Sequence, residues 1–281
     1  MKSIPTVLTA LMFTLPFPVI AEDAKAPFDP KQANELKLTD APLSVIDKLI
    51  AVEQDLSRKG KAIDWNQHYR QVSNQFPVPA DIEDARACVL VGFKMADATL
   101  ALKAQNAEEF KRCVELVEKL AVNLDVPQEA LDRSFSVKTA VERNDWLDAF
   151  MQLSMMRQDV VRQLESLHNG DRSRGILIVC GAWMQASRVA YNLVTDDVLD
   201  ASATNYLRAP LFVGLMRKEL EGISDPGLKN SAQVKDLLGM MPEIEQIVTI
   251  DRNPDIPEGQ VTREKLDRLR DIATKFFTDQ L

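Results

Sequence analysis

One uncharged stretch limits the fold of this chain more than any other feature. Residues 174–193 read RGILIVCGAWMQASRVAYNL, and no charged side chain occurs between Gly175 and Ser187. A helix that is apolar on nearly every side is normally enclosed by other helices rather than laid on a surface. The stretch therefore predicts a buried central helix over about 174–193.

The rest of the chain has the pattern of further helices. Apolar residues recur at helical spacing, sustained alternation typical of strands is absent, and only ten of 281 residues are glycine. Short connections between about nine expected helices favour antiparallel neighbours. We predict an all-α fold: a compact, mainly antiparallel multi-helix bundle, forming a single domain over residues 40–281.

Specific residues predict where these helices begin and end. Asn106 with Glu109 resembles a capping box, Asp145 or Asn144 can cap a helix from Trp146, and Asn169-Gly170 is a helix stop. We expect one helix from Pro127 to about Arg143. The region 224–259 predicts one or two short helices, and Thr262 is expected to cap the last helix.

The N-terminus has the layout of a secretory signal peptide. Lys2 precedes an apolar core at 6–15, and Val19-Ile20-Ala21 suits cleavage after Ala21. The core is too short to span a bilayer. We predict a signal peptide at 1–21, a flexible lead-in at 22–39, no stable membrane anchor after cleavage, and a periplasmic or secreted bacterial protein.

Charge argues against polyanionic partners. Without Lys2 the mature chain has 33 basic and 42 acidic residues, a net charge of −9. Such a balance disfavours nucleic acid and anionic membranes. Partners are expected to be a protein or a small ligand.

The central helix supplies the candidate ligand site. Arg188 ends the uncharged run, and a buried arginine requires an anion, either a carboxylate of the protein or a ligand. Asp97 on the helix beginning at Asp81 is a plausible partner for Arg188, although Lys94 could equally pair with Asp97. Three interpretations stay open: a structural tie between core helices, a ligand pocket, or an Arg188 that faces solvent. The candidate ligand-binding residues are Asp97, Trp183, Gln185, Arg188 and Tyr191.

These residues also carry a family resemblance. The segment Gly181-Ala182-Trp183-Met184-Gln185, with Tyr191 further on, resembles the G-x-W-[IV]-E segment of uncharacterised exported all-helical proteins of several bacterial groups. Asp97 and Leu124-Asp125-Val126 are similar to an earlier stretch of that family, so the resemblance covers roughly 81–193. It implies an exported helical protein and adds no reaction. Gln185 stands where the family commonly has Glu, so a role of that carboxylate cannot transfer unchanged.

Metal and catalytic signatures are weak. Met151, Met155 and Met156 could offer soft sulfur ligands to copper, but the same spacing makes a core stripe. Residues 251–262 begin like a calcium loop and then lack its glycine and its final Glu. Neither histidine belongs to a metal or catalytic motif, and the three cysteines are predicted to be buried free thiols. We predict no catalytic residue, no metal site and no cofactor.

Two functions remain from the sequence. The first is a non-enzymatic exported protein that binds a partner or acts in the cell envelope. The alternative is a small-ligand-binding protein or enzyme with a polar pocket around Arg188 and Asp97. The pocket requires an open cavity at Arg188, whereas a structural role requires Arg188 to be closed off and paired within the chain.

Overall fold

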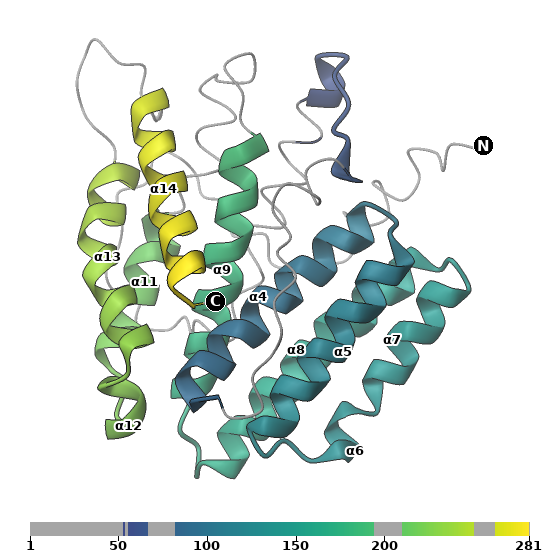
Figure 1. The fold of residues 1–281 in the computed structure, drawn as a ribbon, viewed down its shortest axis with the longest axis horizontal. Helices are drawn as coiled ribbons and strands as arrows, with labels where there is room; N and C mark the ends of the chain where they lie inside the picture. The colour runs from purple at the N-terminus through teal and green to yellow at the C-terminus, as the bar shows by residue number, and fades with distance from the viewer. Residues whose placement is uncertain (1–52, 54–55, 67–81, 194–209, 250–261, 281) are drawn as a thin grey trace.

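The computed structural model describes residues 53, 56–66, 82–193, 210–249 and 262–280, and every regular element within these ranges is an α-helix (Figure 1). The predicted all-α bundle is therefore confirmed. The expected signal peptide and lead-in lie outside the described residues. The helices are α4 (Asp84–Lys103), α5 (Ala107–Asn123), α6 (Gln128–Leu131), α7 (Arg133–Glu142), α8 (Trp146–Leu167), α9 (Ser173–Leu193), α11 (Pro210–Glu221), α12 (Pro226–Lys229), α13 (Ala232–Val248) and α14 (Arg263–Gln280).

The centre of the molecule holds two buried helices rather than one. In α9 every residue from Ser173 to Tyr191 is buried, as predicted, and in α4 every residue from Ala87 to Leu102 is buried as well. The two helices cross in the middle of the view in Figure 1 and form the most extensive helix pair of the fold. The core is therefore built on the α4–α9 pair.

The other helices cover this pair from two sides. In Figure 1, α5, α7 and α8 lie to the right of α4 and α9, while α11, α13 and α14 lie to the left. Helix α4 turns back into α5, and α7 packs against α8, so each pair forms an antiparallel hairpin. The C-terminal helix α14 packs directly on α9.

Local chemistry sets several helix ends as the sequence predicts. The Asn106 side chain accepts a hydrogen bond from the Glu109 amide at 3.2 Å, and Asp145 accepts one from the Asp148 amide at 3.1 Å. After α8 the backbone turns through Asn169 (φ 56°) and Gly170 (φ 86°), the left-handed conformation that ends helices.

Three helix predictions need comment. The helix expected from Pro127 to Arg143 is divided at Asp132 into α6 and α7. The prediction of one or two short helices over 224–259 is wrong in part. Helix α12 is short, but α13 is 17 residues long and contains Pro242. Proline removes one backbone hydrogen bond, but Leu237, Met241 and Ile244 are buried around it, and this packing maintains the helix. The sequence also predicts a helix from about Asp40 to Gly60 and a shorter one from Trp65 to Phe76, and both lie largely outside the described residues.

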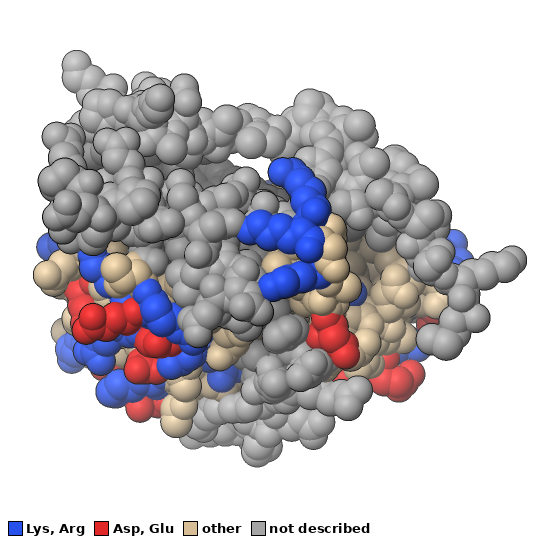
Figure 2. Space-filling view, turned by 90° about the horizontal axis from the view of Figure 1, so that it is seen from above, with Lys and Arg blue, Asp and Glu red and all other residues tan. Residues whose placement is uncertain are grey.

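The surface carries charges of both signs close together. In Figure 2, Lys and Arg lie among Asp and Glu in the group at the lower left. Ion pairs between helices include Arg268 with Glu243 and Arg217 with Glu245. Among the described helices, none combines the length and apolarity that crossing a bilayer requires.

Candidate functional site

Two glycines bring the central helices close enough to share a polar cluster. A Cβ on Gly92 would lie 2.0 Å from the carbonyl oxygen of Ile178, and one on Gly181 would lie 2.3 Å from that of Val89. Since backbone blocks each position, only glycine permits this approach. The contact is reciprocal, because Ile178 lies three residues before Gly181 in α9 and Val89 lies three residues before Gly92 in α4.

Asp97 is the centre of the cluster. Its Oδ2 accepts a hydrogen bond from Lys94 Nζ at 2.7 Å, and its Oδ1 accepts one from Gln185 Nε2 at 2.5 Å. All three side chains have no exposed surface. The predicted alternative, in which Lys94 pairs with Asp97, is therefore confirmed. Gln185 supplies the link between α4 and α9.

Arg188 lies against aromatic rings beside this cluster. Its guanidinium carbon is 3.5 Å from the ring centroid of Phe277 on α14, and Phe277 stacks on Phe93 of α4 at 4.9 Å. Burial lowers the pKa of Arg188 to about 10, while the Asp97 charge acts in the opposite direction. With 6% of its surface exposed, Arg188 is closed off from solvent.

The five candidate residues do not converge on one point. Asp97 and Gln185 are bonded, and Arg188 feels the Asp97 charge. Trp183 is two residues from Gln185, hence about 200° around the helix, and it stacks on Phe212 of α11 at 6.3 Å.

Tyr191 is buried in α9 one turn after Ser187. Burial raises the pKa of its phenol, and Ser187 partly opposes this rise. Even so, the Tyr191 hydroxyl makes no well-formed hydrogen bond within the described chain. Neither Trp183 nor Tyr191 joins the group around Asp97.

The cluster is suited to holding helices together. Two cationic side chains and one carboxylate share it, and it contains no pairing of a nucleophile with a base. One acceptor, Gln185 Oε1, finds no donor in the part of the chain that the structure describes. The closed position of Arg188 and its contact with Phe277 favour a structural tie between helices over an open pocket.

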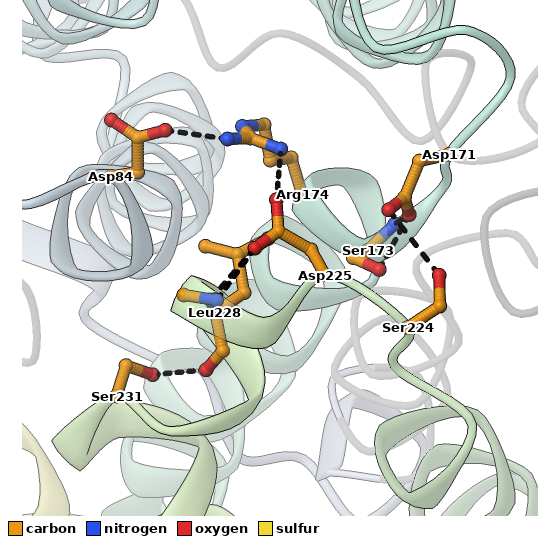
Figure 3. A network of polar contacts seen from close by, with 9 residues as sticks. Asp84, Asp171, Ser173, Arg174, Ser224, Asp225, Leu228 and Ser231 are labelled. Carbon is orange, nitrogen blue, oxygen red and sulfur yellow. Dashed lines mark hydrogen bonds and ion pairs between the residues drawn. The ribbon is translucent and has the colours of Figure 1, made fainter.

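A second polar network, which was not among the predictions from the sequence, lies at the start of α9 (Figure 3). The Arg174 guanidinium donates to Asp84 Oδ2 of α4 at 2.6 Å and to Asp225 Oδ2 at 3.3 Å. Asp225 also caps α12 by accepting from the Gly227 and Leu228 amides. A signal was present: a basic residue at a helix start opposes the dipole and calls for an acidic partner.

The remaining candidates give no reactive centre. Cys88, Cys113 and Cys180 are buried free thiols, as predicted, and burial raises the pKa of Cys88 and Cys180. Met151 and Met155 face solvent, at 36% and 39% exposure, as a copper site would require. However, the Met155 sulfur accepts a hydrogen bond from Arg133, and this positive charge opposes a bound cation.

The residues considered as metal ligands lie partly within the described ranges. Within the described ranges, no three His, Cys, Asp or Glu side chains gather in a way that could hold a metal ion. Most of the calcium-like loop at 251–262, and His68, lie outside those ranges.

Comparison with known proteins adds no relative. No family model, no curated protein and no solved structure matches this chain. The resemblance through Gly181, Trp183 and Gln185 therefore stays a prediction.

Proposed function

We propose that this chain is an exported, non-enzymatic bacterial protein that acts in the periplasm or outside the cell by binding a partner protein. The central polar cluster supports the non-enzymatic part of the proposal, since Asp97, Gln185 and Arg188 are buried and engaged with neighbouring helices. Because the central cluster is buried, the proposed binding surface lies on the outside of the bundle. The same closure counts against the alternative of a small-ligand pocket around Arg188 and Asp97.

The observation that carries the proposal is the exposure of Phe135, at 75%, on the first turns of α7. Val122, at 50% exposure, lies in the last turn of α5, the helix that contacts α7. Both flank one contact between these helices, in which Ser134 and Lys138 bind Glu118. Large apolar side chains that stay in water mark contact surfaces when they lie together. We name residues 122–135 the α5–α7 corner.

The charge of this corner indicates the chemistry of the partner. Three exposed acidic residues lie between Val122 and Phe135 in the chain, and none of them forms an ion pair within the described residues: Asp125, Glu129 and Asp132. An apolar centre with a charged rim is the usual anatomy of a protein interface. The partner that fits is a protein with an apolar pocket bordered by Lys or Arg, and its encounter with this chain should be steered by charge.

Crosslinking from the corner tests the proposal. A photo-crosslinking amino acid at position 135 is expected to capture one partner in the producing cells, whereas the same group at Thr274, exposed on α14, is expected to capture none. The captured chain should be the mature form beginning at Glu22 in the periplasmic or extracellular fraction. With the purified partner, Phe135→Ala should weaken binding about tenfold or more.

The acidic rim gives a second, separable measurement. Replacing Asp125 and Asp132 by Asn and Glu129 by Gln should weaken binding at low salt and flatten its salt dependence, because the steering charge is removed. The proposal fails if position 135 captures no more than position 274, or if the partner binds the Phe135→Ala variant as tightly as the native chain.

A further inference from the structure

Arg157 is a buried cation in the middle of α8. Its exposed fraction is 8%, and it interrupts a buried stripe that is otherwise apolar. Leu153, Val160 and Leu164 lie within two helical turns of Arg157 and are also buried. The guanidinium thus lies in the low-dielectric side of the helix that faces the core.

No group in the described chain neutralises this cation. Among the described residues Arg157 has no hydrogen bond or ion pair, and its Nη1 atom is buried without an acceptor. Other arginines on this side of the fold are paired: Arg133 binds Asp159 at 2.6 Å, and Arg162 reaches the same carboxylate at 3.6 Å. Among these three arginines, only Arg157 lacks a partner within the described residues.

A buried guanidinium without an anion is energetically unfavourable. Arginine remains protonated in proteins, so the group cannot escape the cost of burial by losing its proton. Desolvation alone lowers the pKa of Arg157, and no nearby carboxylate counteracts it. An anion that reaches the guanidinium from outside the described residues would offset this cost.

We propose that Arg157 holds the carboxylate of a small ligand whose remaining part is apolar. A single buried positive charge is neutralised by one negative charge, which favours a carboxylate over a phosphate dianion. The planar guanidinium also matches a carboxylate with two parallel hydrogen bonds. Apolar side chains border the position, since Phe150 and Val161 are partly buried against the core within two turns of Arg157. A short-chain or medium-chain fatty acid has this chemistry.

This site is independent of the proposed function. It uses no residue of the α5–α7 corner and none of the cluster at Asp97. Loss of carboxylate binding would leave crosslinking at Phe135 unaffected, so the two proposals can fail separately.

Thermal unfolding of the full mature chain tests the site. In HEPES buffer at constant ionic strength, acetate, hexanoate and octanoate should raise the midpoint in that order, by about 5 °C for a ligand at a hundred times its dissociation constant. Octanol and phosphate serve as comparisons, one lacking the charge and the other the apolar part. Neither should produce the shift.

Substitution of the arginine gives the decisive comparison. Arg157→Met should abolish the octanoate shift while melting, without ligand, at or above the native midpoint, because it removes an uncompensated charge. Arg162→Met is the matched control, as Arg162 is 72% exposed, and should retain the full shift. A large drop in the midpoint of ligand-free Arg157→Met would show a partner within the chain and overturn the proposal.

Titration calorimetry on the native chain provides a readout that needs no variant. Octanoate binding with one site per chain is the expected result. Absence of binding, or equal binding of octanol, would overturn the assignment of a carboxylate site even if Arg157→Met did not fold.

Discussion

At the scale of single residues, the few charged side chains in the core depend on one another for compensation of their charge. Asp97 accepts hydrogen bonds from Lys94 and Gln185 and also acts on the Arg188 charge. One carboxylate therefore offsets two cations that have almost no contact with water. Buried groups of this kind depend on one another, so their contributions to stability should not add.

Asp97→Asn should lower the free energy of unfolding by about 3–5 kcal/mol, because it leaves Lys94 and Arg188 without the carboxylate that compensates them. The double change Lys94→Met with Asp97→Leu should recover only part of this loss, since it removes Lys94 together with its carboxylate but leaves Arg188 without one. Urea unfolding of the native chain, of Asp97→Asn, of the double variant and of its two single variants, Lys94→Met and Asp97→Leu, measures the differences. A double change that costs the sum of two single ones would contradict this coupling.

At the scale of helices, the approach of α4 to α9 depends on a missing side chain at two positions. Gly92 lies against Ile178 and Gly181 against Val89, in each case backbone against backbone. A backbone cannot move aside as the end of a flexible side chain can, so an added methyl group must separate the helices. That separation would also pull Gln185 away from Asp97.

Gly92→Ala and Gly181→Ala should each cost more than about 3 kcal/mol, at the severe end of single substitutions. Matched controls lie in other helices: Gly214 in α11 and Gly239 in α13 have nothing within 4 Å of an added Cβ. Alanine there should stabilise the protein by up to about 1 kcal/mol, through its better helix propensity. Thermal melts of the four variants make the comparison, and equal effects at Gly92 and Gly239 would refute close packing at the crossing.

At the scale of the whole molecule, the sequence predicts the elements better than their partners. The uncharged run at 174–193 identified α9, and Asn106 and Asn169-Gly170 marked helix ends correctly. Helix α4 was not recognised as equally buried, because Lys94 resembles a surface residue until Asp97 is seen to neutralise it.

The candidate site was less predictable for a similar reason. Spacing places Trp183 and Gln185 on different faces of α9, but it cannot tell which helix meets each face. The bond from Gln185 to Asp97 joins residues 88 positions apart, and the contact of Arg188 with Phe277 depends on where α14 docks. The lack of a partner for Arg157 among the described residues could likewise not be seen before the helices around α8 were placed.

The α11–α13 side of the bundle is also joined to the central pair by an ion pair, and this gives a prediction for acid stability. Asp225, from the α11–α13 side, binds Arg174 at the start of α9. The pKa of Asp225 is lowered from 3.8, first by the hydrogen bond from the Leu228 amide and then, after other contributions, by the Arg174 charge. Because the folded pKa is below the unfolded one, this contribution is complete above about pH 4 and is lost as pH falls through the folded pKa.

Asp225→Asn should therefore be less stable than the native chain at pH 7, by up to about 1 kcal/mol, given that the carboxylate is partly solvated. The gap should narrow as pH falls below 4, since the native carboxyl then becomes protonated while the amide is unchanged. Urea unfolding at several pH values between 7 and 3 measures it. A constant gap across this range would mean that Asp225 stabilises the fold through its shape and not through its charge, and the link from α12 to Arg174 would then be incidental.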